Sequence, residues 1–93
     1  MTNNDESWTV YLLRTNEQKL YCGITNNITR RLKQHESGKG AKALRGRGPL
    51  SLVWTQLVRG KSDALKTEHA IKKLSKAQKE QLVVNSEQFI LAN

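Results

Sequence analysis

The chain has 93 residues and a mass of 10.6 kDa, which is the size of one small domain. Hydrophobic residues make up 37% of it, and no apolar run approaches the roughly 18 residues that a membrane span needs. Lysine and arginine number 16 against 8 aspartate and glutamate residues, which gives a formal net charge of +8. The sequence therefore argues against a multidomain or membrane protein, and it predicts a polyanionic partner, most commonly nucleic acid.

The positive charge is concentrated in the middle of the chain. Residues 30–79 hold fourteen cations and three acids, a net charge of +11. The alternative to a nucleic-acid partner is a merely soluble basic protein. Residues 1–7 lack the basic and apolar regions of a secretion signal, and the lone Cys22 has no partner for an internal disulfide, so we expect a cytoplasmic protein.

The first elements predicted along the chain are two strands of a hairpin. Residues 8–13 are β-branched, aromatic and apolar without a breaker, and residues 20–24 form a second apolar run after a polar turn. Gly23 interrupts the second run and predicts a bulge or a group that comes close to the backbone. Cys22 is predicted to be a small buried hydrophobic group rather than a nucleophile.

A helix over residues 28–36 follows, with cap candidates before it and Ile28 and Leu32 on one face. Residues 37–49 hold four of the six glycines and the only proline, so they predict an exposed, mobile loop without a core-forming pattern.

A third strand is predicted over residues 50–58. A helix over residues 63–74 is expected to start from Ser62 as its cap, and a last helix is expected over residues 75–84. The predicted fold class is α+β, in the order β-β-α-β-α-α, with a three-stranded antiparallel sheet flanked by helices. The expected organisation is an N-terminal extension (residues 1–7), one domain (8–84) and a C-terminal tail (85–93).

Two tyrosines lie ten residues apart, one on each strand of the predicted hairpin. A short turn brings Tyr11 and Tyr21 near each other if both side chains face the same side of the sheet. The alternative is that both pack against a helix with their hydroxyl groups at its rim.

Arg31 and His35 are four residues apart on the first predicted helix and therefore share a face. A guanidinium group offers a planar set of donors to phosphate oxygens, and an imidazole can accept or relay a proton near neutral pH. The alternative is a solvated basic face, because Arg30 and Lys33 lie on the same helix.

Glu68 is an acidic residue predicted to lie on an apolar helix face. At about 100° per residue, the apolar arc of its helix includes Leu65 and Ile71, and Glu68 falls inside that arc. A carboxylate there costs several kcal/mol unless it is paired, hydrogen-bonded or bound to a metal. The alternatives are pairing with His69 or Lys72, and a role as an oxygen ligand for Mg²⁺ or Mn²⁺. A closed zinc site is not available to one cysteine and two histidines.

An ordered set of residues resembles the GIY-YIG endonuclease domain. The set comprises Thr9-Val10-Tyr11, Tyr21-Cys22-Gly23, Thr25-Asn26-Asn27, Arg31, His35 and Glu68. The match covers roughly residues 8–83. Within that superfamily the chain looks most like the small stand-alone bacterial proteins, whose basic loop is similar to the Gly-Lys-Gly-Ala-Lys of residues 38–42.

The resemblance implies cleavage of phosphodiester bonds with one divalent metal, Mg²⁺ or Mn²⁺. It implies that Tyr11 activates or aligns the attacking water, that Tyr21 joins the same hydrogen-bond network and that Arg31 clamps the scissile phosphate. His35 would lie near the nucleophile, and Glu68 would hold the metal. The cations expected to contact nucleic acid are Arg30, Lys33, Lys39, Lys42, Arg45, Arg47 and Lys72.

The chain departs from the family pattern at three points. Thr9 replaces the first glycine of the first motif, and Cys22 replaces the middle residue of the second. Many members also place an asparagine after the metal-binding glutamate, whereas the nearest one here is Asn85, with Lys72 or Lys76 as substitutes. The last departure bears on catalytic rate more than on fold.

The resemblance, together with the basic charge, implies a metal-dependent endonuclease that acts on DNA more than on RNA, in DNA repair or processing, and that selects structure rather than sequence. Selectivity would come from nucleic-acid shape or from a targeting partner protein, and a homodimer that cuts both strands stays open. Two alternatives stay open: a nucleic-acid-binding module that has lost turnover, and a small ribosome-associated basic protein that prefers RNA and needs no metal.

Overall fold

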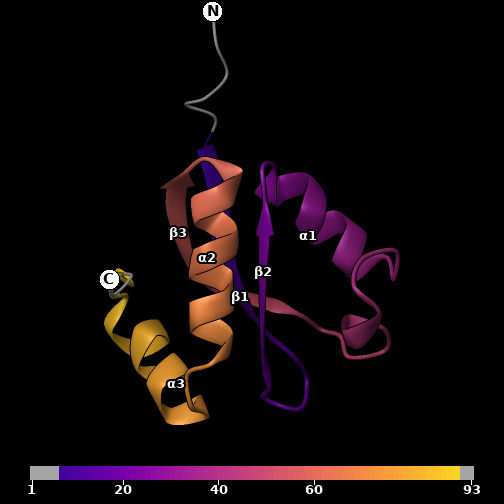
Figure 1. Cartoon of the computed structure of the whole chain (residues 1–93). Helices are drawn as coiled ribbons and strands as arrows, with labels where there is room; N and C mark the ends of the chain where they lie inside the picture. Colours follow the sequence, from indigo (N-terminus) through magenta and orange to yellow (C-terminus); the bar gives the residue numbers. More distant parts are fainter. Residues whose placement is uncertain (1–6, 91–93) are drawn as a thin grey trace, which may run out of the picture.

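The structure is a computed structural model that describes residues 7–90, and the ends of the expected extension and tail (residues 1–6 and 91–93) lie outside the described residues. The elements are β1 (Ser7–Arg14), β2 (Leu20–Thr25), α1 (Ile28–Glu36), the 3₁₀ turn η1 (Lys42–Leu44), β3 (Ser51–Arg59), α2 (Lys61–Lys72) and α3 (Lys76–Asn85). Figure 1 shows them in chain order.

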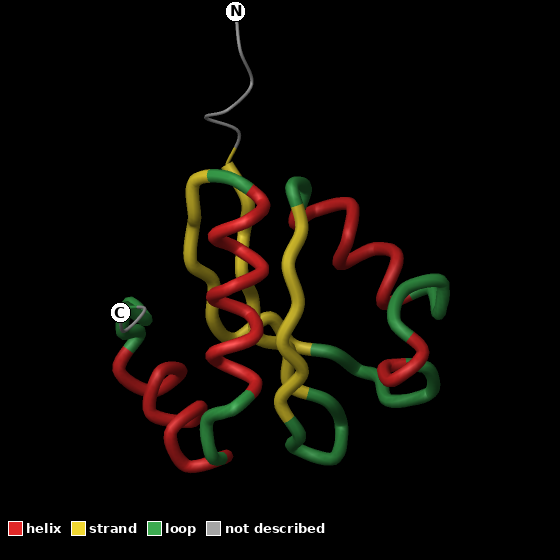
Figure 2. The backbone as a smooth tube through the Cα atoms, in the orientation of Figure 1, coloured by secondary structure: helices red, strands yellow, loops and turns green. Residues whose placement is uncertain are grey.

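The three strands form one sheet in the order β2-β1-β3, and both neighbouring pairs are antiparallel. The predicted α+β fold with a three-stranded antiparallel sheet is therefore confirmed, and Figure 2 shows helices on either side of the strands. In the hairpin, Tyr11 lies opposite Gly23 and Leu13 lies opposite Tyr21.

The central strand β1 contributes to two cores, because alternate residues of a strand face opposite sides of the sheet. The first core lies under α2 and α3 and contains Val10, Leu12, Cys22, Trp54, Ala64, Ile71 and Leu82. The second lies under α1 and the loop that follows it, and it contains Tyr11, Leu13 and Leu44 with Tyr21, Ile28, Leu32, Ala41 and Leu50 packed around them.

The loop over residues 37–49 is more ordered than the sequence predicts. It contains the turn η1, and Leu44 within it is only 3% exposed. The backbone closes this turn by a hydrogen bond from Leu44 N to Ala41 O, and the loop is fixed to the first hairpin by a bond from Asn16 N to Arg47 O. The prediction of an exposed loop without a core-forming pattern was wrong, because Leu44 belongs to the second core and Ala41 packs against that core.

The helix α2 also differs from its prediction. It begins at Lys61 after Gly60, without a side-chain cap, so Ser62 is not its cap. Leu65 is 46% exposed rather than buried, whereas Thr67 is 3% exposed and its hydroxyl donates to the Asp63 carbonyl. The buried stripe is therefore rotated away from Leu65, and Glu68 lies at its border.

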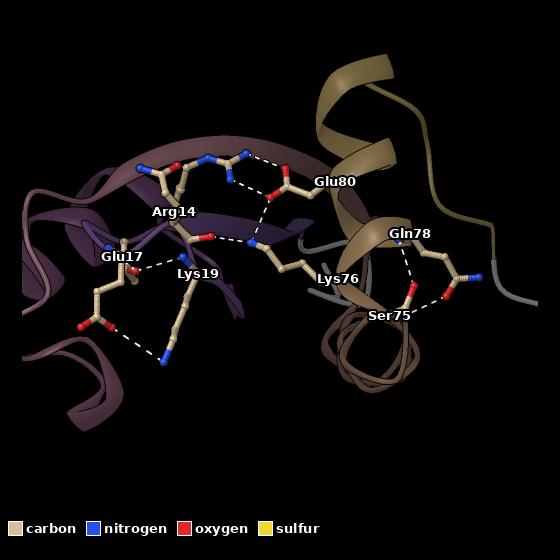
Figure 3. Close-up of polar contacts among 9 residues, drawn as sticks. Arg14, Glu17, Lys19, Ser75, Lys76, Gln78 and Glu80 are labelled. Atoms are coloured by element: carbon tan, nitrogen blue, oxygen red, sulfur yellow. Dashed lines mark hydrogen bonds and ion pairs between the residues drawn. The ribbon is translucent and has the colours of Figure 1, made fainter.

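The helix α3 is capped by Ser75, which forms a capping box with Gln78. The guanidinium group of Arg14 at the end of β1 donates two hydrogen bonds of 2.7 Å to the Glu80 carboxylate on α3, and Lys76 donates to the same carboxylate at 3.1 Å. Figure 3 shows that these contacts connect the first strand to the last helix.

No helix in the described part of the chain combines the length and the apolar character needed to cross a membrane.

Candidate active site

Tyr11 and Tyr21 lie on the same face of the sheet. Their ring centroids are 6.4 Å apart, because Tyr21 is the diagonal neighbour of Tyr11 across the β1–β2 pair. Tyr11 is 1% exposed, and Tyr21 is half-buried. Tyr11 is thus part of the second core, while Tyr21 packs at the edge of that core.

His35 joins the two phenols. Its Nε2 lies 2.8 Å from the Tyr11 hydroxyl oxygen, and its ring centroid lies 5.9 Å from that of Tyr11 and 5.7 Å from that of Tyr21. The residue is 3% exposed. Asn27 caps α1 by accepting from the Arg30 backbone N–H, and this start places His35 one turn after Leu32, on the face that packs on the sheet.

Two glycines make room for this cluster. A Cβ on Gly23 would lie 2.5 Å from the Tyr11 hydroxyl oxygen, so the close approach predicted at this residue is confirmed. A Cβ on Gly40 would lie 2.2 Å from His35 Nδ1, and the backbone N–H of Ala41 donates to that nitrogen at 3.3 Å. Sequence reasoning gave Gly40 and Ala41 no role of their own. The signal in the sequence that could have pointed to them is the pair of adjacent small residues between Lys39 and Lys42.

The charge of Arg31 acts on both partners of the Tyr11–His35 bond. Burial raises the pKa of Tyr11, and a hydrogen bond with Arg31 opposes that rise. Burial lowers the pKa of His35, and the positive charge of Arg31 lowers it further. Both groups are therefore uncharged near neutral pH. The Arg31 guanidinium also donates to Gln34 at 3.0 Å, which holds it along α1.

Glu68 lies on α2, and its contacts are on the other side of β2 from the phenols. Its carboxylate pairs with Lys72 at 3.2 Å, and its side chain is 18% exposed. Burial raises the pKa of Cys22 to about 12, and the nearby charge of Glu68 adds to this rise. Cys22 is 4% exposed, so the prediction that it is buried is confirmed. In Figure 1, the edge strand β2 stands between α1 and α2.

The fit of a divalent metal depends on Glu68 alone. Within residues 7–90, no group of three or more histidine, cysteine, aspartate or glutamate side chains could hold a metal ion. Mg²⁺ is commonly held by one or two carboxylates, with waters and substrate phosphates as its other ligands. The half-buried carboxylate fits that arrangement, provided that the ion replaces the Lys72 ammonium group beside it.

The cations predicted to contact nucleic acid fall into two groups. Arg47 pairs with Glu17, and Lys72 pairs with Glu68. Exposed cations on α1 and on the loop after it are Arg30, Lys33, Lys39, Lys42 and Arg45. The exposed group lies on the elements that cover the phenol side of the sheet.

The family model of the GIY-YIG catalytic domain matches residues 7–81. A UPF0213 protein of Vibrio campbellii is 54% identical to this chain over 82 residues, which cover 88% of this chain and 79% of that protein. The UPF0213 protein VC_A0739 of Vibrio cholerae is 61% identical over 77 residues, which cover 82% of this chain and 76% of that protein.

Two solved structures are also similar. The solution NMR structure of the UPF0213 protein BH0048 from Bacillus halodurans has a TM-score of 0.56 and 44% identity, and the match covers 85% of this chain and 84% of that one. The solution NMR structure of the protein EF2693 from E. faecalis has a TM-score of 0.61 and 33% identity, and the match covers 99% and 100%. The matches therefore extend from the sequence to the fold.

Proposed function

The chain belongs to the GIY-YIG family, with UPF0213 proteins as its relatives, and on this premise we propose that it is an endonuclease that hydrolyses phosphodiester bonds in DNA. The observation that carries the proposal is the buried Tyr11–His35 hydrogen bond, with Tyr21 and Arg31 beside it. A phenol, an imidazole and a guanidinium group that converge within a basic surface suit the alignment of water against a phosphate.

Each group in the cluster has a distinct role in this proposal. Because burial raises the pKa of Tyr11, its hydroxyl is neutral at rest and aligns the attacking water before any proton moves. Tyr21, whose ring centroid lies 6.4 Å from that of Tyr11, adds a second phenol at the half-buried edge of the cluster. Arg31 donates to the oxygens of the scissile phosphate, which stabilises the charge that develops there.

Glu68 completes the site across the edge of the sheet. Because β2 is an edge strand, we propose that the phosphate lies over it, between the phenols on one side and the carboxylate on the other. A bound Mg²⁺ or Mn²⁺ supplies Lewis-acid stabilisation of the phosphoryl oxygens. Lys72 stays paired with the carboxylate until the substrate arrives.

The substrate is proposed from the distribution of charge. Exposed cations on α1 and the following loop contact phosphates without reading bases, so we expect selection by DNA shape, as in branched or damaged DNA. We therefore propose a role in DNA repair or processing in the cytoplasm. A second copy of the chain or a targeting protein would supply further selectivity.

The test is cleavage of supercoiled plasmid and branched DNA by the purified protein with Mg²⁺ or Mn²⁺. We expect Tyr11→Phe, Arg31→Ala and Glu68→Ala each to lower the rate by about 100-fold or more. Lys66→Ala is the matched control for Arg31→Ala, because it removes one exposed cation from α2 without touching the cluster. Full activity in all three site variants would refute the assignment.

A binding module without turnover is the second candidate. It is favoured by the Glu68–Lys72 ion pair and by the lack of an asparagine in the helix that carries Glu68. In that case, wild-type protein would retain salt-dependent DNA binding and would not cut any substrate with either metal. The logarithm of its affinity would still fall by about 0.9 per neutralised phosphate as the logarithm of salt rises.

A further inference from the structure

The segment after α1 folds back so that its backbone contacts the buried face of His35. The backbone nitrogen of Ala41 lies 3.3 Å from His35 Nδ1. A backbone N–H can only donate, so Nδ1 is the acceptor in this bond. A neutral imidazole carries one proton, and with Nδ1 occupied as an acceptor that proton is on Nε2.

The direction of the next hydrogen bond follows from this assignment. The His35 Nε2 faces the Tyr11 hydroxyl oxygen at 2.8 Å, so the imidazole donates and the phenol oxygen accepts. The ring is neutral near neutral pH because burial and Arg31 both lower its pKa. The titratable groups that face it are Arg31 from its own helix, Tyr11 from β1 and Tyr21 from β2.

We propose that Gly40 and the Ala41 N–H are positioning elements that fix the tautomer of His35, so that the imidazole donates to Tyr11 and does not take its proton. This inference rests on the nuclease function proposed above. It assigns His35 the role of a hydrogen-bond donor rather than a proton relay. The Tyr11 hydroxyl proton is then free for another acceptor, and a phenolate that forms during the reaction already has a donor on its oxygen.

Gly40 is essential to this device because of space rather than backbone conformation. A Cβ at this position would lie 2.2 Å from His35 Nδ1, 2.8 Å from Cε1 and 3.0 Å from the His35 Cα. The ring is 3% exposed, and any movement that relieves this overlap displaces Nε2 from its 2.8 Å bond to the Tyr11 hydroxyl. Gly48, in the same loop, has no atom within 4 Å of an added Cβ.

The first test reads the tautomer directly and needs no substrate. Two-bond ¹H–¹⁵N correlation spectra of the labelled full chain at neutral pH should show a protonated Nε2 and an unprotonated Nδ1 for His35. A proton on Nδ1, or an equal mixture of tautomers, overturns the proposal. This readout stands even if the protein cuts no DNA, so it separates failure of this inference from failure of the nuclease function.

The second test compares Gly40→Ala with Gly48→Ala. Gly40→Ala should abolish the single tautomer in the same spectra and lower the cleavage rate by about 10- to 100-fold, since small displacements of reacting groups have effects of this size. Gly48→Ala should retain the wild-type tautomer and rate. If Gly40→Ala leaves the His35 spectrum unchanged in a folded protein, the positioning role is wrong.

The third test separates donation from proton relay. In His35→Gln, a side-chain amide can donate from about the position of Nε2 but does not titrate, whereas His35→Leu removes the donor altogether. We expect His35→Gln to keep a cleavage rate within about tenfold of wild type, the equivalent of about one hydrogen bond, and His35→Leu to lose more. Equal and complete loss in both variants would indicate a proton relay and overturn the proposal.

Discussion

The two faces of the sheet use one central strand in different ways. Under α2 and α3, Val10 and Leu12 pack against apolar side chains such as Ile71. On the opposite face, their neighbour Tyr11 is equally buried but is hydrogen-bonded to an imidazole. Strand alternation therefore separates apolar packing from candidate chemistry by a single residue step. The difference teaches that core residues packed against the apolar face should contribute mainly to stability, whereas the phenol face should contribute to both; Glu68 on α2 is the proposed functional residue on the apolar side.

The largest expected effect on stability is on the apolar face. Ile71→Ala should lower the free energy of unfolding by about 2–5 kcal/mol, because Ile71 is fully buried and its loss leaves a cavity. Urea denaturation measures this change, and cleavage per folded molecule should stay at the wild-type level. Leu65→Ala is the control, since Leu65 is exposed on the same helix. A parallel loss of activity in the folded protein would show that the faces are not separate.

Gly23→Ala should disturb both properties on the phenol face. Its Cβ would overlap the Tyr11 hydroxyl, so the ring must move, at a cost of about 1–3 kcal/mol. Because the ring carries the bond to His35, the cleavage rate should fall together with the unfolding midpoint. Thermal unfolding and plasmid cleavage measure the two effects. Normal activity at reduced stability would mean that the Tyr11 position is not critical.

The Arg14–Glu80 ion pair lies at the rim of the apolar side and should make a smaller contribution to stability. Glu80→Gln should reduce stability by about 1 kcal/mol, or lower the melting temperature by about 4–8 °C, because it weakens a two-bond ion pair with a largely covered guanidinium group. Arg14 lowers the pKa of Glu80 from 4.5 to about 2. This stabilisation is therefore complete above pH 4.5 and is lost as the pH falls toward 2.

The melting temperatures of wild type and Glu80→Gln should consequently converge at the lowest pH of this acid range. Glu36→Gln is the control, because Glu36 is exposed on α1. A constant difference between the curves at every pH would contradict the ion-pair explanation.

The smallest effect on stability is expected from the titration of His35. Its pKa is lowered from 6.5 on folding, so the unfolded chain binds more protons below that pH. Stability should therefore decline as the pH falls through 6.5 toward the folded value, and it should be fully present above 6.5. Melting temperatures from about pH 8 to about pH 5 measure this slope, which His35→Gln should flatten. His69→Gln, at an exposed position, is the control.

The parts of the site that follow from local periodicity were predictable from the sequence. Tyr11 and Tyr21 meet because a short hairpin pairs two strands of period two, and the spacing of Arg31 and His35 follows from one helical turn. The strand and helix order was accessible for the same reason. The predicted boundaries differ from the observed ones by one or two residues. For example, α2 begins at Lys61 rather than at residue 63, and its N-cap residue is Gly60, which has no side chain.

The parts that depend on the path of a loop were not predictable. No local pattern shows that Leu44 returns to the core or that Ala41 reaches an imidazole six residues earlier in the chain. The angular position of Glu68 was also misjudged, because Thr67 rather than Leu65 is buried on α2. A hydroxyl that bonds to its own helix can be buried like an apolar group, and a propensity scale does not anticipate this.

The contact between Gly23 and the Tyr11 ring has a consequence for how this chain can vary. Neither position is independent, because the bare backbone of one residue is the wall against which the phenol of the other rests. A methyl group at position 23 becomes tolerable only after a smaller side chain has replaced the tyrosine. The two positions should therefore vary together. A second-site suppressor of Gly23→Ala should replace Tyr11 by a smaller side chain, which recovers stability but removes the phenol hydroxyl.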